Sequence, residues 1–154
     1  MADRTPHAQP ADVQTLRKTL VEAAVAAADR DPSEIAMRAR ARAETESSET
    51  AQRLAALLED ADWVTPPSAR RRIAGALTYF GDPDCVPEAT RSVAGHALVD
   101  WVAGGLGAEL AAWESFRSYR ERLDRRQGDV EARTRKLYAR RRRLRAGLQN
   151  RRSS

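Results

Sequence analysis

The stretch YFGDPDCVPE, residues 79–88, lies between two segments with helical spacing and decides how they are joined. It contains three acids, two prolines, a glycine and the only cysteine of the chain. Helices commonly end at a glycine such as Gly81, and a proline such as Pro87 is accepted in a first turn. Asp84 lies four residues before Glu88, so Asp84 can cap the next helix while Glu88 sits in its first turn. We therefore predict a stiff corner whose structural residues are Gly81, Asp84, Pro87 and Glu88.

Apolar residues recur with helical spacing on both sides of this corner. Before it they are Ile73, Ala76, Leu77 and Phe80, and after it Val93, Val99, Val102, Leu106, Leu110, Trp113, Phe116 and Leu123. Further helices are expected to begin near Asp12 and at Asp31-Pro32, and a break is expected near Ser47 and Ser48. No segment has a strand pattern. The sequence predicts an all-α fold: a small bundle of four to six helices with a central hairpin around residues 81–87.

The chain length of 154 residues fits one compact domain, which we place at residues 11–127. Residues 1–10 are polar and are expected to be disordered. Residues 93–123 are predicted to form one long helix, weakened at its centre by Gly104, Gly105 and Gly107. Gly128 is expected to separate a last, Arg-rich helix or tail, residues 128–154. No run of residues approaches the length and apolarity of a membrane span.

The single cysteine, Cys85, cannot form a disulfide within the chain, which fits the reducing cytosol. We therefore expect a cytoplasmic protein. The cations are nearly all arginine and alanine is abundant, a composition typical of a GC-rich bacterial genome.

The quoted loop and the helix after it resemble a known family. AGALTYFGDPDCVPE (74–88) and GHALVDWVAGGLGAELAAWESFRSYRERL (95–123) are similar to the YkvA-like family of small bacterial proteins of unassigned function. Members have an Asp-x-Ile-Pro-Asp loop and a Gly-x-Leu-Asp-Asp stretch. Here Glu88 replaces the second loop aspartate, Val99 stands in place of one paired aspartate, and Asp100 matches the other. The resemblance covers residues 72–122 and implies an all-helical fold without an established reaction; some relatives are linked to membranes.

A cation site is the functional alternative to a structural corner. Carboxylates from a loop and a helix, here Asp84, Glu88 and Asp100, are the kind of ligand that Mg²⁺ or Ca²⁺ takes. The commonest role of Asp and Pro in such a loop is turn chemistry, which favours the structural interpretation. The chain has no zinc spacing, phosphate loop or dinucleotide fingerprint. We therefore expect no cofactor and no small-molecule substrate.

The charge of the chain is divided unequally along its length. Residues 117–154 contain 15 Lys/Arg and 4 Asp/Glu, whereas residues 1–116 contain 12 and 18. Five cations fall within six residues near the end: Arg140, Arg141, Arg142, Arg143 and Arg145. On a helix they surround most of the circumference, which suits contact with phosphates more than the reading of bases. A solvated tail is the alternative.

Apolar residues of this tail form a line only one residue wide per turn, with Val130, Leu137 and Leu144 seven apart and Leu148 one turn on. Such a line is too narrow to bury much surface.

The sequence thus predicts a non-enzymatic interaction or regulatory module whose basic tail contacts nucleic acid without sequence specificity, or which has a protein partner. The first alternative is a peripheral membrane protein that binds anionic lipid through the tail. The second is a cation-dependent enzyme that uses the acidic loop.

Overall fold

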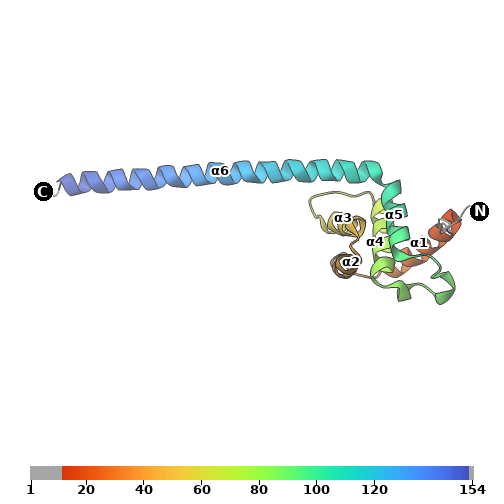
Figure 1. The fold of residues 1–154 in the computed structure, drawn as a ribbon. Coiled ribbons are helices and arrows are strands. Elements are labelled where there is room, and N and C mark those ends of the chain that lie inside the picture. Colours follow the sequence, from red (N-terminus) through yellow and green to blue (C-terminus); the bar gives the residue numbers. More distant parts are fainter. Residues whose placement is uncertain (1–11, 153–154) are drawn as a thin grey trace, which may run out of the picture. The chain divides into compact units, whose positions relative to one another are not determined.

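The computed structural model describes residues 12–152, so the segment predicted to be disordered, residues 1–10, lies outside the described residues. The elements, in chain order, are α1 (Val13–Ala27), α2 (Pro32–Glu46), α3 (Glu49–Glu59), α4 (Pro67–Gly81), the 3₁₀ turns η1 (Pro83–Cys85) and η2 (Glu88–Thr90), α5 (Gly95–Gly105) and α6 (Gly107–Arg152) (Figure 1). No strand occurs among residues 12–152. The predicted all-α fold is confirmed.

Helices α1, α2 and α3 each begin at a residue whose side chain caps a free backbone N–H group. The Asp12 carboxylate accepts a hydrogen bond from the backbone N–H of Gln14 at the start of α1. Asp31 does the same for Ser33 at the start of α2, with Pro32 as the first helical residue. Ser47 adopts a left-handed backbone conformation with φ of 54°, and the Ser48 hydroxyl caps α3. The predicted break at this pair is confirmed.

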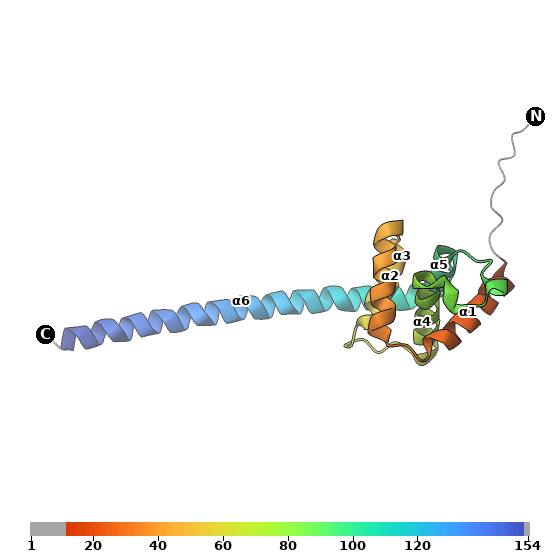
Figure 2. The ribbon, with the colours of Figure 1, turned by 90° about the horizontal axis from the view of Figure 1, so that it is seen from below.

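Contacts divide the chain into two compact units, Met1–Ala111 and Ala112–Ser154. In the first unit α4 is the central helix, because it packs against α1, α2, α3 and α5. Figure 2 shows α4 between α1 and α2. Its large side chains, among them Ile73, Leu77, Tyr79 and Phe80, are buried. The predicted hairpin exists as the packed pair α4 and α5, but two 3₁₀ turns join these helices.

Two predictions on helix boundaries are wrong. The helix after the loop is not continuous: α5 ends at Gly105, and the Leu106 N–H bonds to the carbonyl of Ala103 in a tight last turn. The glycines there weaken the helix enough for the chain to turn. Gly128, by contrast, does not end a helix, because α6 runs through it to Arg152. One exposed glycine costs a helix only about 1 kcal/mol, which good helix formers on both sides offset.

Trp113, one of the apolar residues at helical spacing after the corner, is 1% exposed. Among the described residues, no helix has both the length and the apolar character that crossing a bilayer requires.

α4 and α1 approach each other closely at Gly75. A Cβ atom on Gly75 would lie 3.0 Å from the backbone nitrogen and 3.1 Å from the Cα of Ala24. These are backbone atoms, so a side chain there would force the two helices apart. A Cβ atom on Gly104 in α5 would meet no atom within 4 Å.

We predict opposite effects for alanine at these two glycines. Gly75→Ala should lower the free energy of unfolding by about 1–3 kcal/mol, because the added methyl group overpacks the contact with α1. Gly104→Ala should leave it unchanged or raise it by up to about 1 kcal/mol, since alanine favours the helix. Urea unfolding of both variants checks this. A Gly75→Ala protein at least as stable as Gly104→Ala would show that the two helices do not depend on this contact.

Candidate functional site

The loop after α4 is held by ion pairs that use its acidic side chains. An Arg30 guanidinium nitrogen lies 3.2 Å from the Asp82 carboxylate, which joins the loop to the segment between α1 and α2. Arg91 pairs with Asp84 at 3.0 Å. The Nε–H of Arg91 also donates to the carbonyl of Val86 at 2.8 Å. Two of the three loop acids therefore neutralise arginines of the same unit.

Thr90 joins the loop to α1. Its hydroxyl donates to the Glu22 carboxylate at 2.6 Å, and its carbonyl accepts from the Thr19 hydroxyl at 3.3 Å. The Tyr79 hydroxyl of α4 donates to the carbonyl of Val93. Val86 fills the core at 1% exposure. These long-range contacts fix the corner between α1, α4 and α5.

The capping role predicted for Asp84 is wrong. The next helical turn, η2, follows Pro87 and receives no side-chain cap, while the Asp84 side chain is 83% exposed. The physical reason is that the chain forms a first 3₁₀ turn over Pro83–Cys85, which places Asp84 inside a turn of its own. Glu88 does lie in the first turn of η2.

Gly81 is the last residue of α4, as its predicted role as a helix end requires. A Cβ atom there would lie 3.3 Å from the backbone nitrogen of Ala39, so the absence of a side chain at Gly81 also allows α2 to pack close to α4.

The structure does not gather the three carboxylates considered for a cation. Asp84 faces Arg91, and Glu88 and Asp100 are exposed on η2 and α5. Within residues 12–152, no group of three or more His, Cys, Asp or Glu side chains is close enough to hold a metal ion. The loop thus offers no ready set of ligands to a hard cation.

Cys85 is half-buried beside Asp82. Burial raises the pKa of the Cys85 thiol above its ordinary value, and the negative charge of Asp82 raises it further. A thiol with a raised pKa holds little of the nucleophilic thiolate at neutral pH. The environment of Cys85 is therefore the opposite of the one that activates a catalytic cysteine.

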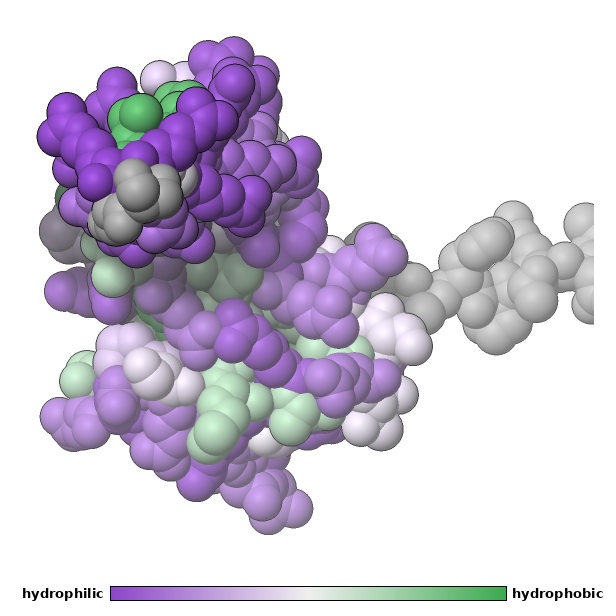
Figure 3. Space-filling model, turned by 90° about the vertical axis from the view of Figure 1, so that its left-hand side faces the viewer, coloured by the Kyte–Doolittle hydropathy of each residue, from purple (hydrophilic) through white to green (hydrophobic). Residues whose placement is uncertain are grey.

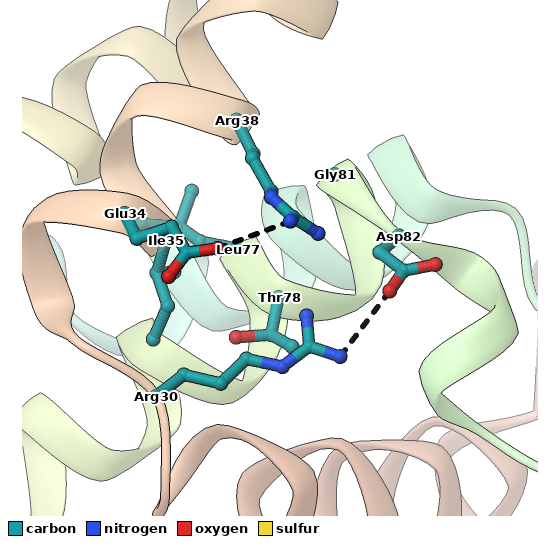
Figure 4. Close-up of a pocket in the computed structure, with 8 residues that line it drawn as sticks. All are labelled: Arg30, Glu34, Ile35, Arg38, Leu77, Thr78, Gly81 and Asp82. Atoms are coloured by element: carbon teal, nitrogen blue, oxygen red, sulfur yellow. Dashed lines mark hydrogen bonds and ion pairs between the residues drawn. The ribbon is translucent and has the colours of Figure 1, made fainter.

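A small cavity lies between α2 and α4, next to the loop (Figure 4). Arg30 and Asp82 form one ion pair at its edge, and Arg38 and Glu34 form another at 3.0 Å. The Thr78 hydroxyl faces this cavity and has no hydrogen-bond partner among the residues that the structure describes. The cavity volume is about 10 Å³, which is the size of one water molecule and too small for an organic substrate.

We predict that Thr90, not Asp84, carries the stability of the corner. Thr90→Val keeps the shape of the side chain but removes the hydrogen bond to the Glu22 carboxylate, and should lower the free energy of unfolding by about 1–3 kcal/mol. Asp84→Ala removes only an exposed ion pair and should cost less than about 1 kcal/mol. Denaturant unfolding compares the two. A larger loss for Asp84→Ala would restore Asp84 as a structural residue of the loop.

The second candidate site is the basic segment, which we define as residues 132–152 of α6. It contains ten Lys/Arg and no Asp or Glu, whereas residues 112–131 contain five of each. Every residue from 121 to 152 is exposed. The arginines of residues 112–131 therefore have acids nearby in the sequence. The basic segment has one neighbouring acid, Glu131, whose carboxylate lies 3.9 Å from the Arg135 guanidinium.

The five arginines predicted to bind anions, Arg140, Arg141, Arg142, Arg143 and Arg145, all belong to this segment and have no ion pair among the described residues. With 3.6 residues per turn, Arg140 lies on one side of Leu137, and Arg141 and Arg145 lie on the other side. In Figure 3, seen from the C-terminal end of α6, hydrophilic residues surround most of the helix and one hydrophobic patch interrupts them. The segment therefore presents positive charge to both sides and not to one face.

Comparisons of the chain with known protein families, with curated proteins and with solved structures give no match. The resemblance of residues 72–122 to the YkvA-like family stays a prediction.

Proposed function

We propose that this protein is a non-enzymatic interaction module that binds the phosphate backbone of nucleic acid through the basic segment of α6. The observation that carries the proposal is the separation of charge along one exposed helix, with ten cations and no acid in residues 132–152. Cations without nearby acids release the counterions of a polyanion when they bind it, which drives association. We place this activity in the reducing cytosol on the ground of the single cysteine.

The helical form of the basic segment supports a duplex as the partner. The major groove of DNA, about 12 Å wide, admits an α-helix and has a row of phosphates on each side. Arginines on both flanks of Leu137 would contact both rows at once. Phosphate contacts carry no sequence information, so the binding is expected to be independent of sequence.

Residues 1–111 carry 12 Lys/Arg and 17 Asp/Glu, and several of these arginines already pair with acids of that unit, as Arg30 does with Asp82 and Arg91 with Asp84. The net charge of this unit is therefore negative, and the unit is not expected to attract phosphate.

The proposal predicts a steep salt dependence that originates in the basic segment. If about five arginines engage phosphates, the log–log slope of the binding constant against salt on duplex DNA should be about −4 to −5. Arg140→Gln with Arg141→Gln, one from each flank of Leu137, should reduce the magnitude of that slope by about 2, since each phosphate contact contributes about 0.9. Titrations with labelled duplexes of different sequence measure both quantities.

The matched control is Arg122→Gln with Arg125→Gln, which removes the same two charges from the first part of the same helix. This pair should leave the slope nearly unchanged. Equal effects of the two pairs would show that net charge alone causes the binding. Deletion of residues 137–154 should abolish binding, and binding that survives it would contradict the proposal. Binding to anionic vesicles but not to DNA or RNA would assign the segment to a membrane surface instead.

A further inference from the structure

The exposed side of α6 carries an apolar line that no described residue covers. Leu123, Val130, Leu137 and Leu144 follow one another at intervals of seven, and their exposed fractions are 44, 60, 61 and 61%. We name these four residues the heptad line. Because α6 continues through Gly128, Leu123 belongs to the same line as the other three. In a coiled coil two positions of each heptad face the partner helix, and the heptad line supplies one of the two.

The helix surface also has the hollow that a coiled-coil partner would fill. A depression of about 200 Å³ is lined by Thr134, Leu137, Tyr138 and Arg141. These residues are spaced i, i+3, i+4 and i+7, which is the set of four that forms the hole for one side chain of a facing helix. When two identical helices lie parallel and in register, the side chain that faces this hole is the Leu137 of the other copy.

We propose that α6 pairs with α6 of a second copy of this chain as a parallel, in-register coiled coil along the heptad line. Each residue of the heptad line then meets its counterpart in the other copy. The heptad line occupies the d position of the repeat, where leucine favours a parallel pair of helices. The second position that faces the partner helix, three residues before each member of the heptad line, holds Gln127, Thr134 and Arg141. These polar side chains pack less well against their counterparts than apolar ones would, so the association is weak.

One pairing of opposite charges lies at the edge of the line in the first part of the helix. In a parallel pair, a residue three after a heptad-line position faces the residue five further on in the other copy. Arg126 therefore faces Glu131 of the second copy, and Arg133 faces Tyr138. Further along, Arg140 faces Arg145, so the basic segments repel each other. Salt screens this repulsion, and the pairing should strengthen as salt rises.

This direction is the opposite of that expected for phosphate binding, which weakens with salt. The pairing does not rest on the proposed function, and the two can fail separately.

Sedimentation equilibrium of the full chain tests the pairing. The average mass should move toward that of a dimer between about 0.1 M and about 1 M salt, where the screening length falls from about 10 Å to about 3 Å. Leu137→Glu should stay monomeric. Ala139→Glu makes a similar change of charge two residues away, on the far side of the helix, and should associate like the unchanged chain. A monomer at every protein concentration up to millimolar, or equal behaviour of the two variants, would overturn the proposal. Circular dichroism confirms that both variants keep their helix.

The orientation is tested by disulfide formation in a Cys85→Ala background. Val130→Cys and Leu144→Cys, placed in separate proteins, should each give disulfide-linked dimers, and Ala132→Cys on the far side should not. Residues 130 and 144 are about 21 Å apart along the helix, so an antiparallel pair brings at most one of them beside its counterpart. Efficient linkage at only one of the two positions would therefore replace the parallel arrangement with an antiparallel one.

Discussion

The burial of α4 among α1, α2, α3 and α5 is the constraint on which the first unit depends. Tyr79 and Phe80 of α4 are buried in this core, and α1 and α2 come close to α4 at Gly75 and Gly81. The corner after α4 must hold a fixed shape, because it turns the chain back so that α5 packs against α4. Ion pairs and the hydrogen bonds of Thr90 provide that rigidity. The acids that stand out in the sequence are thus engaged in holding the fold.

Charge is used differently in the second unit. Residues 112–131 of α6 contain equal numbers of acids and cations, and the basic segment contains cations alone. Most of the stability of a helix in a protein comes from packing, and neighbouring like charges weaken a helix that is not packed. Both proposals made for α6 answer this problem: phosphates of a nucleic acid would neutralise the basic segment, and a second α6 would cover the heptad line. Both partners would lie on the Leu137 face of α6, so one copy of the helix meets one of them at a time.

The sequence was sufficient where local chemistry decides the structure. Asp31-Pro32 and Ser47-Ser48 mark helix boundaries because Asp and Ser bond to free N–H groups at helix starts. Glycines were ambiguous, since the same small penalty ends α5 at Gly105 and is tolerated at Gly128 within α6. The partners of Asp82 and Thr90 lie 52 and 68 residues away, so no local pattern could reveal them. Without them Asp84 resembled a cap, and a cation site stayed an alternative to the favoured structural corner.

The central claim is that the basic segment, and not the acidic loop, is the site of interaction. NMR spectra of the ¹⁵N-labelled full chain, recorded while a short DNA duplex is added, test it most directly. The account predicts that the amide signals of residues 132–152 shift and that those of residues 79–93 do not. Shifts concentrated at residues 79–93, with the basic segment unchanged, would contradict it.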